Sequence, residues 1–170
     1  MKPSDITTLL GELLSQIEEF KYIDRNWGQL ELEQPSVKFP CAITDVDSIQ
    51  YADLLQKAQL AECEFTITIA VQNFHNTSQK SPCKDKGHDI FLLIDKVHEI
   101  LQGYSTEALT PFCRRRLQKI EAEKGYSIYQ LTYSTATKTQ LVPSSHTAKP
   151  KPLLYVSLKN NRSNRSNRSN

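Results

Sequence analysis

The sequence predicts a small α+β domain built from two amphipathic helices and about four or five strands. The best strand pattern is Ala61–Gln72, where apolar and polar residues alternate as on a strand with one buried and one solvent-facing side. Two segments, Ile6–Ile17 and Ile90–Leu101, carry apolar residues at three- and four-residue steps, which is typical of a helix with one buried face. An alternating aromatic segment, Tyr126–Thr137, predicts a closing strand.

The first helix is expected to begin after Ser4, whose side chain can cap the free amides of the first turn, and to end near Phe20. The following segment, Tyr22–Lys38, predicts a short strand or an irregular arm, with Trp27 as a packing anchor. Pro40 is expected at the start of the next strand, because a proline there removes no hydrogen bond from the ladder.

Two connections are long and mostly polar. Ser48–Leu60 predicts one helical turn within a long connection. Asn73–Lys86 is a polar run, and loops of this length in a compact domain are usually functional or disordered.

The second helix is expected over Gly87–Gln102, ended by Gly103, with both of its histidines facing solvent. After this helix in the sequence, Leu117 and Ile120 predict a further strand. The three adjacent arginines Arg114–Arg116 then lie on a strand edge, where charge prevents edge-to-edge aggregation.

The chain divides by charge into residues 1–137 and a tail, 138–170. The tail has seven basic residues and no acidic one, so of the 21 basic and 19 acidic residues in all, 14 basic and 19 acidic remain in the first part. An acidic α+β domain therefore carries a basic tail whose Asn-Arg-Ser repeats predict disorder in the free subunit. With 38% hydrophobic residues, the chain is suited to a single core.

The cysteines do not form a metal or disulfide pattern. Cys41, Cys63, Cys83 and Cys113 are too widely and irregularly spaced for a zinc CxxC pair or a disulfide framework. The first residues lack the apolar run of a signal peptide, and no segment is long and apolar enough for a membrane span. These observations predict folding in a reducing cytosol.

No common catalytic or phosphate-binding motif occurs, so the sequence predicts no enzyme, cofactor, metal or sequence-specific nucleic-acid site. The spacing of His75, Cys83 and His88 matches no common zinc site, and a nucleophilic pair of Cys83 and His75 lacks a rigid support. One alternative stays open, a small cytosolic metal-dependent nuclease-like enzyme with the acids Asp45, Glu121 and Glu123.

Five segments together resemble the tail terminator family of bacteriophages and prophages, also called tail-completion or minor tail proteins. They are Ile6–Ile17, Pro40–Ile43, Glu64–Val71, Asp89–Leu101 and Tyr126–Tyr133. The resemblance covers residues 4–137. It implies a mixed, mostly antiparallel sheet with both helices packed on one face.

The resemblance also implies a function that needs no catalytic residue. Members form a ring, commonly a hexamer, that caps the tail tube, stops its polymerisation and joins it to the head. The implied partners are further copies of the chain, the tail-tube protein and head–tail connector proteins, with no membrane, and the implied location is the host cytoplasm during assembly and then the virion tail. A second alternative is an adaptor that binds an acidic partner through the basic tail.

Contacts in such an assembly are expected in the long loop and the tail, where apolar and basic residues stand in polar surroundings. The candidates are Phe74, His75, Lys80, Lys84, Lys86, Leu153, Leu154, Tyr155, Val156, Arg162, Arg165 and Arg168.

Overall fold

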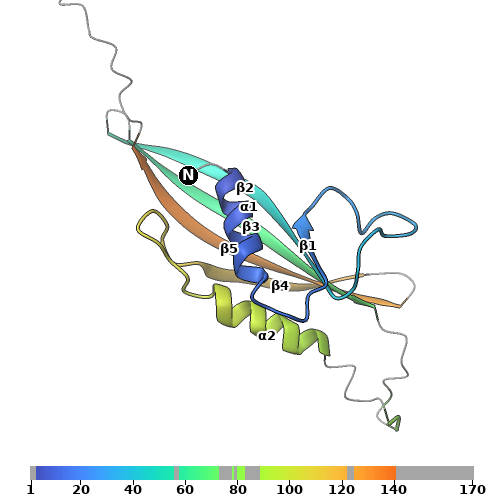
Figure 1. The fold of residues 1–170 in the computed structure, drawn as a ribbon. Helices are drawn as coiled ribbons and strands as arrows, with labels where there is room; N and C mark the ends of the chain where they lie inside the picture. The colour runs from blue at the N-terminus through green and yellow to red at the C-terminus, as the bar shows by residue number, and fades with distance from the viewer. Residues whose placement is uncertain are drawn as a thin grey trace, which may run out of the picture.

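The computed structural model describes residues 3–55, 58–72, 78, 80–82, 89–121 and 125–140. Its elements, in chain order, are α1 (Pro3–Leu14), β1 (Tyr22–Arg25), β2 (Cys41–Leu55), β3 (Ala58–Gln72), α2 (Asp89–Leu101), β4 (Cys113–Ile120) and β5 (Tyr126–Gln140). The α+β class is confirmed (Figure 1).

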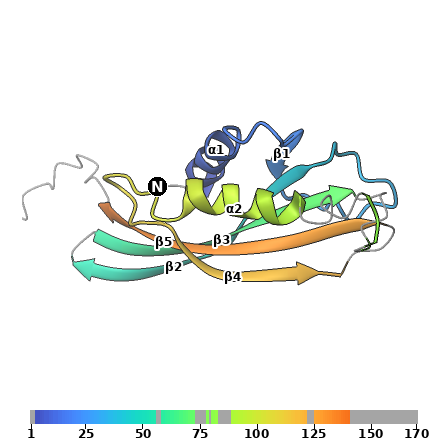
Figure 2. The ribbon, with the colours of Figure 1, turned by 90° about the horizontal axis from the view of Figure 1, so that it is seen from below.

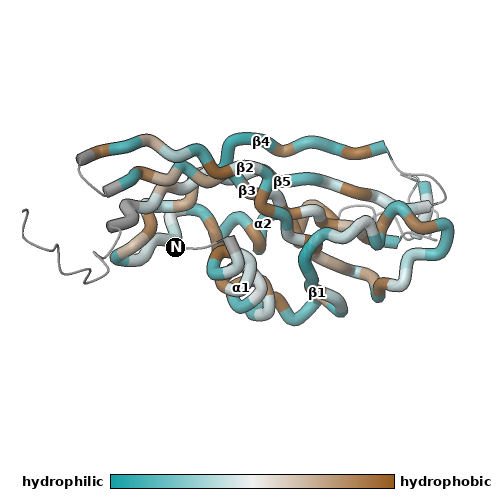
Figure 3. The backbone as a smooth tube through the Cα atoms, turned by 90° about the horizontal axis from the view of Figure 1, so that it is seen from above, coloured by the Kyte–Doolittle hydropathy of each residue, from teal (hydrophilic) through white to brown (hydrophobic). Residues whose placement is uncertain are grey.

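The strands form one mixed sheet in the order β1-β2-β3-β5-β4. β1 is parallel to β2, and the three other pairs are antiparallel, as expected. Figure 3 shows hydrophilic and hydrophobic residues alternating along the strands, which gives the sheet two chemically different faces.

Both helices cover the same face of the sheet (Figures 1 and 2), as the resemblance implied. Between helices and sheet lies the main core, in which Phe65, Phe112 and Tyr133 are fully buried. The ring of Phe65 stacks on Tyr133 at 5.7 Å between centroids and meets the edge of Phe112 at 5.0 Å. Ile90, Leu93, Ile94, Val97 and Leu101 form the buried side of α2, which confirms the predicted apolar face of this helix.

The opposite face of the sheet is only partly open to solvent, contrary to the expectation of a fully wet face. Residues 26–40 fold over one end of it, and a second small core there contains Cys41, Ile43 and Ala70. Ala70 is therefore buried although its strand position faces away from the helices. On the same face, Glu62 and Glu64 are exposed, as the alternation predicted.

The predicted end of the first helix near Phe20 was wrong, because α1 ends at Leu14. Beyond Leu14 the backbone makes three-residue turns, in which Ile17 N–H donates to the carbonyl of Leu14 and Phe20 N–H to that of Ile17. Apolar residues spaced by three stay on one side of such turns, so Ile17 and Phe20 are buried without a helix. Gly103 ends α2 in the left-handed conformation, with φ +78°, as expected.

The expectation of a helical turn in Ser48–Leu60 was also wrong. Here β2 continues to Leu55 and β3 begins at Ala58, so the two strands form one long hairpin. β5 lies beside β3 up to Gln140, three residues beyond its expected end. Figure 1 shows these three strands running past α1 to the upper left, and we call this part, residues 47–55, 58–64 and 135–140, the strand extension.

Candidate functional site

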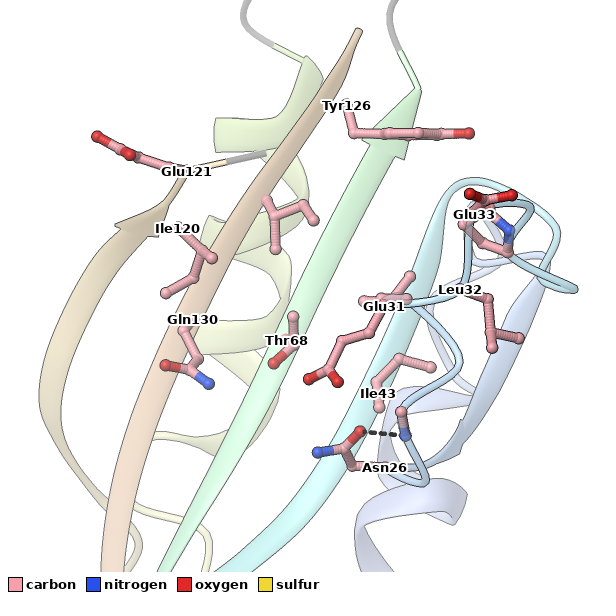
Figure 4. A pocket seen from close by; sticks show the side chains of 14 residues that line it. Asn26, Glu31, Leu32, Glu33, Ile43, Thr68, Ile120, Glu121, Tyr126 and Gln130 are labelled. Atoms are coloured by element: carbon pink, nitrogen blue, oxygen red, sulfur yellow. Dashed lines mark hydrogen bonds between the residues drawn. The ribbon is translucent and has the colours of Figure 1, made fainter. Parts of the chain in front are cut away.

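An open groove of about 560 Å³ lies on the sheet face away from the helices. One wall is the segment after β1, and the other is formed by the ends of β4 and β5, with β2 and β3 beneath (Figure 4). The lining residues that carry its chemistry are Leu30, Glu31, Glu33, Ile43, Glu121 and Ile128.

The groove has apolar residues at its base and along its walls, beside the polar side chains of Thr68 and Gln130, and an acidic rim. Ile43, Leu30 and Ile128 belong to the small core on this face. Glu31, Glu33 and Glu121 are exposed, and no lysine or arginine is among the described residues that line the groove. Such a groove is complementary to a segment that carries both basic and apolar side chains.

A polar network holds the wall after β1 in place. Gln29 is fully buried, and its amide accepts a hydrogen bond from Trp27 N–H at 2.9 Å and donates one to the carbonyl of Arg25 at 2.8 Å. Asn26 accepts from Gly28 N–H at 3.1 Å, drawn in Figure 4, and donates to Asp45 at 3.0 Å. Gly28 adopts φ +87°, a conformation that other residues rarely take.

Trp27 was predicted as a packing anchor, and that prediction was wrong, because its side chain is 54% exposed. The indole N–H donates to Asp24 at 3.2 Å, and the Tyr22 hydroxyl donates to the same carboxylate oxygen at 2.7 Å. These hydrogen bonds, that of Tyr22 above all, lower the pKa of Asp24 because they favour its charged form. The tryptophan is thus bonded through its polar N–H group while more than half of the residue stays exposed.

Toward its tip, the strand extension presents apolar side chains outside the two core clusters of the described residues. Tyr51 is 58% exposed and Leu54 is 44% exposed, although both lie on the long strand β2. Val46 and Ile49, a few residues earlier, still pack against the main core. The apolar side chains of β2 therefore leave the core between Ile49 and Tyr51.

His98 was expected to face solvent, but it is half-buried, and its Nδ1 lies 3.4 Å from the Tyr133 hydroxyl. Desolvation lowers the pKa of His98, with a further contribution from nearby Arg114. Burial also raises the pKa of Tyr133 to about 12. His98 and Tyr133 thus form a polar contact at the border of the core. The spacing of residues along the helix could not indicate this contact, because Tyr133 lies on β5.

The cysteines behave as core residues. Burial raises the pKa of both Cys41 and Cys63 to about 11, so neither thiol is activated. Cys113 is half-buried at the start of β4. All three are free thiols, and Cys83 lies outside the described residues.

Of the predicted assembly contacts, Lys80 alone falls among the described residues, where it is exposed. The others lie outside them: Phe74, His75, Lys84, Lys86, Leu153, Leu154, Tyr155, Val156, Arg162, Arg165 and Arg168. The groove and the strand extension are surfaces that the sequence analysis missed. A clue to the groove was present in Asn26-Trp27-Gly28, a typical turn sequence.

The acids of the nuclease alternative are spread out. Asp45 accepts from Asn26, Glu121 lies on the groove rim, and Glu123 is outside the described residues, as are His75, Cys83 and His88. Within the described part of the chain, no three histidine, cysteine or acidic side chains are grouped as metal ligands.

Comparison with known protein families and with curated proteins gave no match for this chain. None of the helices in the described ranges has the length and apolar character needed to cross a membrane.

Proposed function

We propose that this chain is a structural subunit of a phage or prophage tail, forming a ring that caps the tail tube, stops its polymerisation and joins it to the head. The order of elements supports this proposal through its resemblance to tail terminators. The observation that carries it is the strand extension, in which Tyr51 and Leu54 are exposed on strands that continue beyond the core. Apolar side chains exposed where a strand continues past the core of its own chain are available to be covered by another molecule.

A ring subunit must offer different surfaces to its two neighbours, because only a head-to-tail contact repeats around a closed ring. A sheet with an extension at one end and a groove at the other has such surfaces. The groove, with Glu31, Glu33 and Glu121 on its rim, is complementary to a basic segment, and the tail 138–170 of a neighbouring copy has that composition.

The test is light scattering after size-exclusion chromatography, over a range of protein concentrations, alone and mixed with the tail-tube protein encoded in the same gene cluster. We expect a closed oligomer in at least one condition, visible as rings by negative-stain electron microscopy. A monomer in every condition, with no binding to the tube protein, would contradict the proposal.

The two alternatives predict different results. A metal-dependent nuclease would cleave DNA with Mg²⁺ or Mn²⁺ and lose that activity in the Asp45→Ala and Glu121→Ala variants. An adaptor would bind an acidic partner only when residues 138–170 are present, and would form no ring. Either result would replace the proposed function.

A further inference from the structure

The sheet has two edges along which no described strand pairs. β1 pairs with β2 only along Cys41–Thr44, so Val46–Leu55 of β2 has β3 on one side and no strand of the described residues on the other. At the opposite edge, β4 pairs with β5 alone. Gln102 accepts a hydrogen bond from Arg114 N–H at 3.0 Å, and the register with β5 shifts between Arg114 and Arg116, so the regular free edge of β4 is Arg116–Ile120. Unpaired edges are the places where a strand of another chain can add to a sheet.

These edges carry opposite charges. β4 contains four basic residues and no acidic one, Arg114, Arg115, Arg116 and Lys119. The free edge Val46–Leu55 of β2 contains two acidic residues and no basic one, Asp47 and Asp53. Among the described residues, one ion pair is present, and it joins Glu19 and Lys96. The charged side chains on the two edges therefore form no ion pair with described groups of their own chain.

Like charges on each edge oppose the pairing of two identical edges. Two paired β4 strands would place basic residues opposite one another, and two paired β2 strands would place acidic residues opposite one another. Like charges in such cross-strand positions destabilise the pairing. Pairing of β4 with β2 of another copy brings opposite charges together. The charge pattern therefore selects the head-to-tail contact and disfavours both symmetric ones.

Strand direction and apolar side chains agree with this contact. Along the sheet, β2, β3, β5 and β4 alternate in direction, so β4 of one subunit meets β2 of an identically oriented neighbour as an antiparallel pair. Leu117 lies opposite Leu131, a main-core residue, and is 45% exposed. Tyr51 lies opposite Ala61, which shares a face with Cys63 of the same core. Leu117 and Tyr51 are thus on the same face of a joined sheet.

We propose that β4 of one subunit pairs in antiparallel fashion with Val46–Leu55 of β2 in the next, so that the sheet continues from subunit to subunit. This inference rests on the proposed ring and assigns its lateral contact. β1 covers the other half of the β2 edge, so the neighbour is shifted toward the strand extension, where Tyr51 and Leu54 are exposed.

Two charge variants test the contact. The basic-edge variant carries Arg115→Glu, Arg116→Glu and Lys119→Glu, and the acidic-edge variant carries Asp47→Asn, Gln50→Lys and Asp53→Lys. Asparagine at 47 keeps an oxygen that can accept from the Thr66 hydroxyl, which bonds to Asp47. We expect each variant alone to associate at least about tenfold more weakly in sedimentation velocity, since both edges of a subunit then have the same sign.

An equal mixture of the two variants is expected to recover association to within about threefold of wild type, because each edge again meets one of opposite sign. The rings should contain the two variants in alternation, which native mass spectrometry measures as equal numbers. A single chain with both sets of substitutions should also assemble. Recovery in the mixture shows that both variants are folded.

A control carries Lys21→Glu and Lys38→Glu, which change the net charge by four units, the same size of change as in the acidic-edge variant, at exposed positions outside these two edges. It should assemble like wild type. The edge contact is wrong, and the ring stands, if the wild-type protein forms rings and either edge variant alone forms them equally well. The same conclusion follows if folded variants do not recover association when they are mixed. If wild type forms no ring in any condition, the proposed function itself fails.

Discussion

Replacing Tyr51 and Leu54 together by threonine should weaken association without destabilising the subunit. A buried aromatic side chain removes about 150–250 Å² from water, so the 58% of Tyr51 that is exposed leaves roughly 90–150 Å² for a neighbour to cover. At about 25 cal/mol per Å² this area is worth about 2–4 kcal/mol. Leu54, 44% exposed, adds about 1 kcal/mol.

Part of this gain is offset by the ordering of side chains at the contact, so we expect the association constant to fall by about a hundredfold. Threonine preserves strand propensity, and both positions are exposed in the subunit, so the melting temperature of the monomer should change by less than about 2 °C. Sedimentation velocity measures the first quantity and circular dichroism the second. The control is Leu92→Ala on α2, which removes a side chain that is 60% exposed on a different element.

Two results would refute this reasoning. If the double threonine variant associates as tightly as wild type, the strand extension is not a contact. If Leu92→Ala weakens association as much as the double variant does, exposed apolar residues act without regard to their position, and the extension has no special role.

The remaining predictions concern the subunit. In urea unfolding, Leu93→Ala should lower the stability by about 2–5 kcal/mol, whereas Leu92→Ala, one residue away on the solvent side of α2, should change it by less than about 1 kcal/mol. Similar losses for the two variants would mean that α2 buries a different face. The pKa of His98 is lower in the folded state than in the unfolded state, so this group contributes stability above the unfolded pKa that is lost as pH falls through the folded pKa. His98→Gln should therefore flatten the fall of melting temperature from pH 7 to pH 5. An unchanged slope would contradict the lowered pKa. Iodoacetamide applied briefly to the native protein should spare Cys41 and Cys63, whose burial raises their pKa to about 11, and mass spectrometry that finds either labelled before unfolding would show that the core opens there.

The main core could be predicted because its pattern is local. In Asp89–Leu101 one face is buried and the other is largely exposed, and in Ala61–Gln72 alternate residues are buried in the main core or packed against it, so the periodicity of the sequence reports the periodicity of the structure. The end of α1 was misplaced because Ile17 and Phe20 keep a spacing of three that suits a helix and a series of tight turns equally well.

The groove could not be predicted because its walls come together only through tertiary structure. Ile43 lies on β2, Ile128 lies on β5 and Glu121 directly follows β4, and the opposite wall comes from residues 26–35, far in the sequence from Ile128 and Glu121. Trp27 shows the same limit at a single position. An isolated tryptophan favours burial as an average over proteins, but here the indole N–H is bonded to Asp24, and that partner decides where the ring lies.

Within the strand extension, Ser48–Leu60 was predicted as one helical turn in a long connection, for a reason that bears on its function. Alternation appears in a strand only when one face is buried, and past Ile49 neither face of β2 packs against the main core of its own chain. Ser48–Leu55 therefore reads as an irregular mixture of polar residues with Tyr51 and Leu54. What stabilises this segment within the subunit is backbone pairing with β3, and through β3 with β5. A strand whose own chain gives it ladder hydrogen bonds on one side and a free edge on the other has room for a second strand. Opposite charges on β2 and β4 supply a reason for that strand to come from another copy, so the failure of the sequence pattern and the proposed assembly contact share one physical cause.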